Sequence, residues 1–176
     1  MASVMTGEGI LTGGKIVIVD RDYANFLKER GYGTMEGEEL ILLPEEALYL
    51  SEDGRLKVRN EETGKEEGFQ SLAERFIRAR PELWTRYLIY RDLRKKGYVV
   101  KDGYGLGLDF LVYERGSFGK EPAKFLVLGF SEGETLELEG LIETLRMAMG
   151  SKKEMILAVV ESRGDVVYYA VSHVGF

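Results

Sequence analysis

The side chains that most often carry catalysis at neutral pH are nearly absent from this sequence of 176 residues. It contains no cysteine and a single histidine, His173, close to its end. A Ser-His-Asp triad or a histidine-based metal site would depend on that one residue, and cysteine nucleophiles and thiolate zinc sites are excluded. We expect His173 to be a histidine of a strand surface or an interface. The lack of cysteine favours an intracellular protein.

A second group of chemically capable residues is the mixture of basic and aromatic side chains between Tyr90 and Lys101. Its cations are Arg91, Arg94, Lys95, Lys96 and Lys101. Such a mixture is typical of proteins that contact RNA phosphates beside stacked bases, although a solvated helix end explains it equally well. The net charge of −6 argues against a nucleic-acid partner. The acidic excess, however, lies in residues 1–70, with 8 basic and 15 acidic residues, whereas residues 71–176 carry 16 and 15.

The elements of residues 1–70 predict a small α+β domain. Residues 16–19 form a β-branched run that predicts a strand, and Asp20 is placed to cap a helix over residues 23–29. Residues 40–43 and 47–50 predict strands around a turn at Pro44, and the polar residues 51–68 a loop or hairpin. The domain boundary is expected near Gln70.

Residues 71–176 predict an α/β domain with a mixed central sheet. A helix begins at Ser71, and a second begins at Pro81 and ends at Gly97. Strands are expected at 98–100, 108–113 and 124–130, and the glycine-rich run at 103–107 lacks phosphate-loop spacing and predicts a turn. The clearest helix carries one apolar face, formed by Leu138, Leu141, Ile142, Leu145 and Met149. Strands 155–160 and 166–171 close the domain, and no apolar stretch reaches membrane-spanning length.

Three segments of this second domain carry a resemblance to a known family. They are YRDLRKKGYVVKDGYGLGLDFLVY from Tyr90, AKFLV from Ala123, and KKEMILAVVESRGDVVYY from Lys152. In order, spacing and element type they resemble the C-terminal domain of archaeal tRNA-splicing endonucleases, over about half of the chain. The α+β domain stands where that family has its smaller domain, so the resemblance implies a nuclease-like fold for residues 71–176.

The resemblance implies RNA cleavage without a metal or cofactor. The RNA 2′-hydroxyl attacks the adjacent phosphate and leaves a 2′,3′-cyclic phosphate and a 5′-hydroxyl. By position, the general base of the family matches Tyr113, and the lysine that stabilises charge on the phosphate matches Lys153, with Lys152 one place away. Arg146 matches an arginine that clamps a bulged base.

The sequence departs from the family pattern at the position of the general acid. The family's histidine stands immediately before the Ala-x-Tyr/Phe-Leu-Val strand, where this sequence has Pro122. Loss of a positioned acid costs about 10²- to 10⁴-fold in rate. The resemblance therefore implies a non-catalytic structural subunit with Tyr113 and Lys153 vestigial. Its partner would be a catalytic chain, with two of each, acting on precursor tRNA in the cytoplasm.

Two features bear on assembly with such a partner. The loop between the last two strands carries Glu161 and Asp165, and in the family a loop at this place enters a basic pocket of the opposite subunit; an ordinary polar turn is the alternative. The last strand is expected to lie at an edge, where a second chain can pair. Two other functions stay open: an active nuclease that uses Tyr113 and Lys153 with another acid, and an RNA- or protein-binding module that kept the fold.

Overall fold

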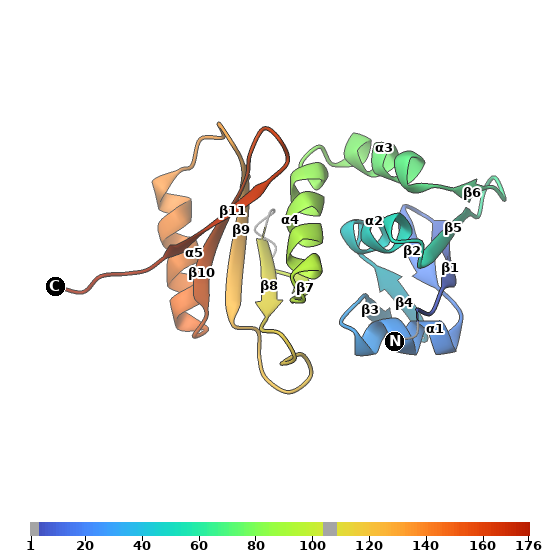
Figure 1. Cartoon of the computed structure of the whole chain (residues 1–176), viewed down its shortest axis with the longest axis horizontal. Helices are drawn as coiled ribbons and strands as arrows, with labels where there is room; N and C mark the ends of the chain where they lie inside the picture. Colours follow the sequence, from blue (N-terminus) through green and yellow to red (C-terminus); the bar gives the residue numbers. More distant parts are fainter. Residues whose placement is uncertain (1–3, 104–108) are drawn as a thin grey trace. The chain divides into compact units, whose positions relative to one another are not determined.

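The computed structural model describes residues 4–103 and 109–176, which divide into two compact units, Met1–Tyr87 and Leu88–Phe176 (Figure 1). We describe each unit by itself. Most of the glycine-rich run at 103–107 lies outside the described residues. No described helix is long and apolar enough to cross a bilayer.

The first unit is built on a six-stranded sheet. Its strands are β1 (Gly7–Thr12), β2 (Lys15–Ile18), β3 (Thr34–Glu36), β4 (Glu39–Leu42), β5 (Leu56–Asn60) and β6 (Glu66–Glu67). They follow the order β3-β4-β2-β1-β5-β6, in which β1 and β5 are parallel and the other neighbours antiparallel. Three helices belong to it, α1 (Arg21–Glu29), α2 (Pro44–Glu52) and α3 (Phe69–Ala79). The α+β prediction is confirmed.

Helix α1 follows the predicted cap at Asp20 directly and so begins two residues before the predicted start at 23. The Asp20 carboxylate accepts a hydrogen bond from the Tyr23 backbone N–H at 2.7 Å, as an N-cap side chain does. At the other end Gly31 adopts a φ of 79°, which ends the helix in the left-handed region.

The prediction of a strand over residues 47–50 was wrong, because these residues lie in α2. Pro44 occupies the first turn, where its fixed φ suits a helix and its missing N–H costs nothing. The Glu46 carboxylate accepts hydrogen bonds from the backbone N–H groups of Leu43 at 2.8 Å and Gly33 at 3.0 Å. A short apolar run has no distinctive periodicity, so the start signals at Pro44 and Glu46 decide its structure.

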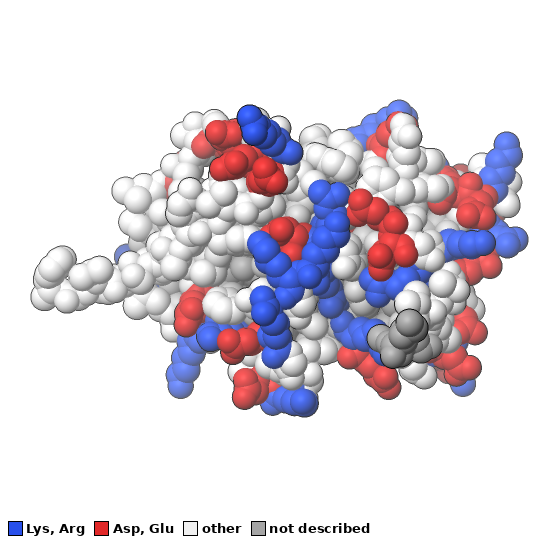
Figure 2. Space-filling model, viewed as in Figure 1, with Lys and Arg blue, Asp and Glu red and all other residues white. Residues whose placement is uncertain are grey.

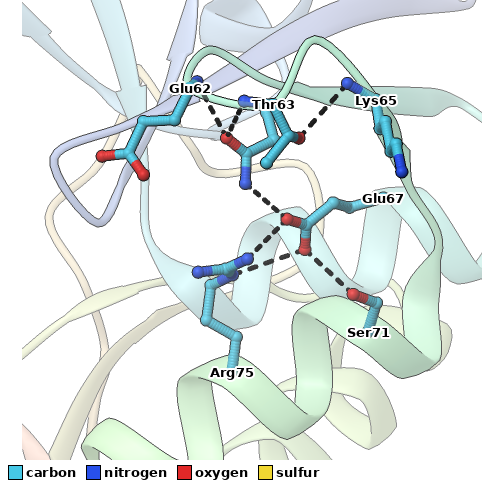
Figure 3. Close-up of polar contacts among 7 residues, drawn as sticks. Glu62, Thr63, Lys65, Glu67, Ser71 and Arg75 are labelled. Carbon is cyan, nitrogen blue, oxygen red and sulfur yellow. Dashed lines mark hydrogen bonds and ion pairs between the residues drawn. The ribbon is translucent and has the colours of Figure 1, made fainter.

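A hairpin of β5 and β6 follows α2 and is fixed to α3 by Glu67 (Figure 3). The Glu67 carboxylate accepts hydrogen bonds from Asn60 Nδ2 at 2.7 Å, Ser71 Oγ at 3.0 Å and Arg75 Nη2 at 2.5 Å. Burial alone would raise the pKa of Glu67, but these donors together lower it, so the group stays ionised at neutral pH. Of the loop or hairpin predicted for residues 51–68, the structure has the hairpin.

The division between the units lies farther along the chain than the boundary predicted near Gln70. Helix α3 packs against α2, and Phe69 contacts Tyr87 with ring centroids 5.7 Å apart. These contacts keep α3 and the first residues of α4 (Leu83–Lys95) with the first unit. The change in composition near Gln70 marks the end of a polar loop. The first unit continues past it, as far as these side-chain contacts extend.

The second unit contains one five-stranded sheet in the order β11-β10-β9-β8-β7. Its strands are β7 (Val99–Asp102), β8 (Asp109–Tyr113), β9 (Phe125–Ser131), β10 (Glu154–Val160) and β11 (Val166–Val171). Strands β9 and β10 are parallel, joined through α5 (Leu138–Gly150), and the other neighbours are antiparallel. The mixed sheet predicted for this domain is confirmed.

The two faces of this sheet have different neighbours. On one face, Leu126, Leu128 and Met155 pack with Ala148 of α5 and form a buried cluster. On the other, Phe110 contacts Tyr90 of α4, with ring centroids 6.2 Å apart. Alternation along the strands therefore assigns each residue to an α5 face or an α4 face.

Helix α5 exposes more apolar surface than its periodicity predicted. Thr144 and Ala148 are buried, and Leu141 and Leu145 pack against the cluster, but Leu138 is 69% exposed. Ile142 and Met149 are exposed as well. The prediction of a single core face was therefore correct for only part of the helix, because a neighbouring sheet covers a narrower stripe than the apolar residues occupy.

Candidate functional site

Tyr113 and Lys153 lie at the same end of the second sheet. Tyr113 is the last residue of β8, and Lys153 directly precedes β10. Lys124, directly before β9, links the strands on either side. Its backbone N–H donates a hydrogen bond to Val112 O of β8 at 3.0 Å, and its carbonyl oxygen accepts one from Glu154 N of β10 at 2.9 Å. Three neighbouring strands thus begin or end together at this point.

Both side chains are assigned to the α5 face. Tyr113 is two residues after Leu111, and Lys153 two residues before Met155, and both of these apolar residues pack in the α5 cluster. Lys153 is half-buried, with its ammonium 3.4 Å from Ser151 O. Lys152 is exposed and has a φ of 55°, so the turn directs the two lysines differently.

Pro122 lies at the entrance to β9, beside this strand end, and is exposed. Its neighbour Lys124 donates to Glu114 Oε1 at 3.2 Å. That hydrogen bond and the Glu114 charge, with a smaller contribution from Glu154, raise the pKa of Lys124 above its ordinary value. At the position where a proton donor is expected, this chain has Pro122. The nearby Lys124 holds its proton more tightly than an ordinary lysine.

The basic residues predicted to contact RNA between Arg91 and Lys101 lie on α4, on β7 and in the turn between them. Arg91, Arg94 and Lys95 lie on α4 and Lys101 on β7, and Figure 2 shows Lys and Arg side chains gathered over α4. Lys95 is exposed, whereas Arg94 donates from Nε to Tyr90 OH at 3.1 Å.

Lys96, directly after α4, has a role within the fold. Its ammonium lies 2.7 Å from Asp92 Oδ2 and 4.8 Å from the centroid of the Tyr168 ring. The Tyr168 hydroxyl donates to the same carboxylate oxygen at 2.6 Å, and burial followed by this bond raises the pKa of Tyr168. Lys96 and Asp92 thereby tie β11 to the end of α4, which spacing alone did not reveal.

The remaining predicted residues lie on exposed parts of the second unit. Arg146 projects from α5 and is exposed. Glu161 and Asp165 flank the turn between β10 and β11, where Glu161 N donates to Asp165 O at 2.8 Å. Glu132 supports this turn, because its carboxylate accepts a hydrogen bond from Ser162 N at 2.8 Å, and no sequence pattern indicated that contact.

Two family models and several characterised relatives match this sequence. Residues 83–168 match the model of the tRNA intron endonuclease, catalytic C-terminal domain, and residues 7–73 match that of its N-terminal domain. The chain belongs to the tRNA intron endonuclease family. Its relatives include the tRNA-splicing endonucleases of Methanococcus vannielii, 36% identical over 90% of this chain and 89% of that protein, and of Thermococcus kodakarensis, 36% identical over 94% and 97%. That of Methanothermobacter thermautotrophicus is 37% identical over 80% and 81%.

Membership of the tRNA intron endonuclease family confirms the resemblance found in the sequence. The N-terminal model ends at residue 73, inside α3, and the C-terminal model begins at residue 83, at the start of α4. The match to the C-terminal model includes Tyr113, Pro122 and Lys153 and extends to Tyr168. The strand end described above therefore lies inside the domain that the family calls catalytic.

Proposed function

We propose that this chain is the structural, non-catalytic subunit of a tRNA-splicing endonuclease that removes introns from precursor tRNA in the cytoplasm. The observation that carries the proposal is Pro122, which stands at the entrance to β9 beside Tyr113 and Lys153. Proline has no ionisable group and cannot protonate the 5′-oxygen that leaves. Tyr113 and Lys153 are then remnants of a site that has lost its general acid.

The charges around this strand end support the same conclusion. Lys124 lies near the place of the missing acid, but Glu114 raises its pKa and makes it a weaker proton donor at neutral pH than an ordinary lysine. Glu114 also compensates the charge of Lys124, at 3.2 Å, which leaves that lysine without free positive charge for an RNA phosphate. Electrostatic stabilisation of a phosphate transition state needs positive charge that is not already paired.

The experiment that tests the proposal uses this chain with a family member from the same organism that carries histidine before the β9 segment. We expect no cleavage of an intron-bearing tRNA precursor by this chain alone, and cleavage with 2′,3′-cyclic phosphate ends when both chains are present. Each chain is also assayed alone at the same total concentration. Rapid cleavage by this chain alone would overturn the proposal in favour of an active nuclease that takes its acid from water or another chain.

The second unit has a surface suited to such a partner. Strand β11 is at the edge of the sheet, and Tyr169 on it is 55% exposed. Leu138, Ile142 and Met149 of α5 add exposed apolar side chains, and Figure 2 shows few charges around α5, β11 and the C-terminus. Exposed apolar side chains gathered on one face are typical of a surface that another chain covers.

The hairpin turn supplies the test of assembly. We expect the double variant Glu161→Lys, Asp165→Lys to lose the heteromeric complex and to unfold at an unchanged temperature, because both side chains are exposed and project from a turn. Size-exclusion chromatography with light scattering measures the mass of the mixture with the partner chain. Glu61→Lys, Glu62→Lys in the first unit is the matched control, and an unchanged mass for the hairpin variant would contradict this docking role.

A binding module that kept the fold but left tRNA splicing is the remaining alternative. This alternative predicts that adding this chain does not raise the cleavage rate of a partner chain. The mixing experiment above separates the two, since a structural subunit must restore cleavage to its partner.

A further inference from the structure

A hollow of about 240 Å³ opens on the α4 face of the second sheet, away from Tyr113 and Lys153 on the α5 face. Its lining residues are Leu93, Lys96, Tyr98, Val112, Phe125, Val127, Ile156 and Tyr168. Because pockets for drug-sized ligands start at about 300 Å³, this hollow suits one flat ring system.

Three of the lining residues are aromatic, and each has a cation close to its ring. Arg115 Cζ lies 5.0 Å from the Tyr98 centroid, Lys124 Nζ lies 5.3 Å from that of Phe125, and Lys96 Nζ lies 4.8 Å from that of Tyr168. The rings of Tyr98 and Phe125 meet edge to face, 6.4 Å apart. Aromatic surface beside cations is the chemistry with which proteins hold an unstacked base and its phosphate.

The three cations are not equivalent. Asp92 neutralises Lys96 and Glu114 neutralises Lys124, at 2.7 and 3.2 Å. Arg115 is exposed and makes no ion pair with any of residues 4–103 and 109–176. Its guanidinium keeps a full charge and five donors for a phosphate.

We propose that this hollow binds one unstacked base of single-stranded RNA, with Tyr98 stacking on the base and Arg115 binding the adjoining phosphate. The inference extends the proposed role in tRNA splicing, because it gives a chain without a general acid its own contact to RNA. An apolar side chain of a partner protein would fill the same hollow without using the charge of Arg115.

The test measures binding of a fluorescein-labelled single-stranded RNA hexamer to the full chain by anisotropy at several salt concentrations. We expect Tyr98→Ala to weaken binding roughly 5- to 150-fold, as loss of one base stack does, and Tyr98→Phe to keep the affinity. Arg115→Ala is expected to lower the slope of log K against log salt by about 0.7, the loss of one phosphate contact. Lys28→Ala, an exposed lysine of the first unit, is the matched control.

Photo-cross-linking gives a second measurement that does not depend on a variant. An RNA hexamer carrying 4-thiouridine should label peptides that contain Tyr98, Phe125 or Tyr168. Equal affinities and salt slopes for wild type and Arg115→Ala, or labels confined to other peptides, would overturn the proposal. If the hollow stays unlabelled because the partner chain shields it, that result would also overturn the proposal and make the hollow a protein-docking site. Neither measurement involves cleavage, so the proposal and the proposed function can fail separately.

Discussion

The Pro122→His variant is expected to cleave an intron-bearing tRNA precursor about 10²- to 10⁴-fold faster than the wild-type chain, which is the usual contribution of a positioned general acid. Pro122 is exposed, so the imidazole can be accommodated without repacking. Tyr113 and Lys153 already stand at the same end of the sheet. Single-turnover rates with end-group analysis of the products measure the gain.

Three comparisons make this result specific. Pro122→Ala removes the proline without adding an acid and should stay at the wild-type rate. Adding Tyr113→Phe to Pro122→His should abolish the gain, because the base is then missing. Since an acid must be protonated to act, activity of the variant should fall as pH rises through about 6.5, the ordinary pKa of histidine. A Pro122→His chain no faster than Pro122→Ala would show that the two retained residues are no longer arranged for catalysis.

The second large effect is expected at the buried ion pair of the first unit. Glu45 of α2 and Arg86 of α4 are 1% and 3% exposed, with Arg86 Nε 2.5 Å from Glu45 Oε1. Arg86→Met leaves the carboxylate buried without its charge partner, which typically costs about 3–5 kcal/mol. Urea unfolding measures this as a lower midpoint.

The double variant Glu45→Leu, Arg86→Met should recover most of the lost stability, because it removes both charges from the interior. Arg59→Met, which breaks the exposed pair of Arg59 with Glu8, should cost at most about 1 kcal/mol. If Arg86→Met costs no more than Arg59→Met, the buried pair does not hold the start of α4 to α2.

The sequence predicted most elements of the second unit, because its strands and helices carry strong patterns and Gly97 marks the end of α4. It failed at residues 47–50, where β-propensity suggested a strand and Pro44 and Glu46 begin a helix. That error also hid the buried pair, since Glu45 reaches Arg86 only from a helix.

The candidate site was predicted from resemblance, and the structure adds what spacing could not express. Strand register brings Tyr113 and Lys153 to one end of the sheet, although 39 positions separate them in the printed sequence. The Glu114 contact to Lys124 and the cations around Tyr98, Phe125 and Tyr168 depend on side-chain packing across strands. No periodicity in the sequence encodes these contacts.

The position of β11 at the edge of the sheet limits the concentration of this chain that a cell can tolerate. An exposed edge with apolar neighbours pairs with whatever strand it meets, including that of another copy. Molecules made in excess of their partner would therefore be drawn into self-association and lost to quality control. The amount of this protein would then be set by the supply of the chain that covers β11.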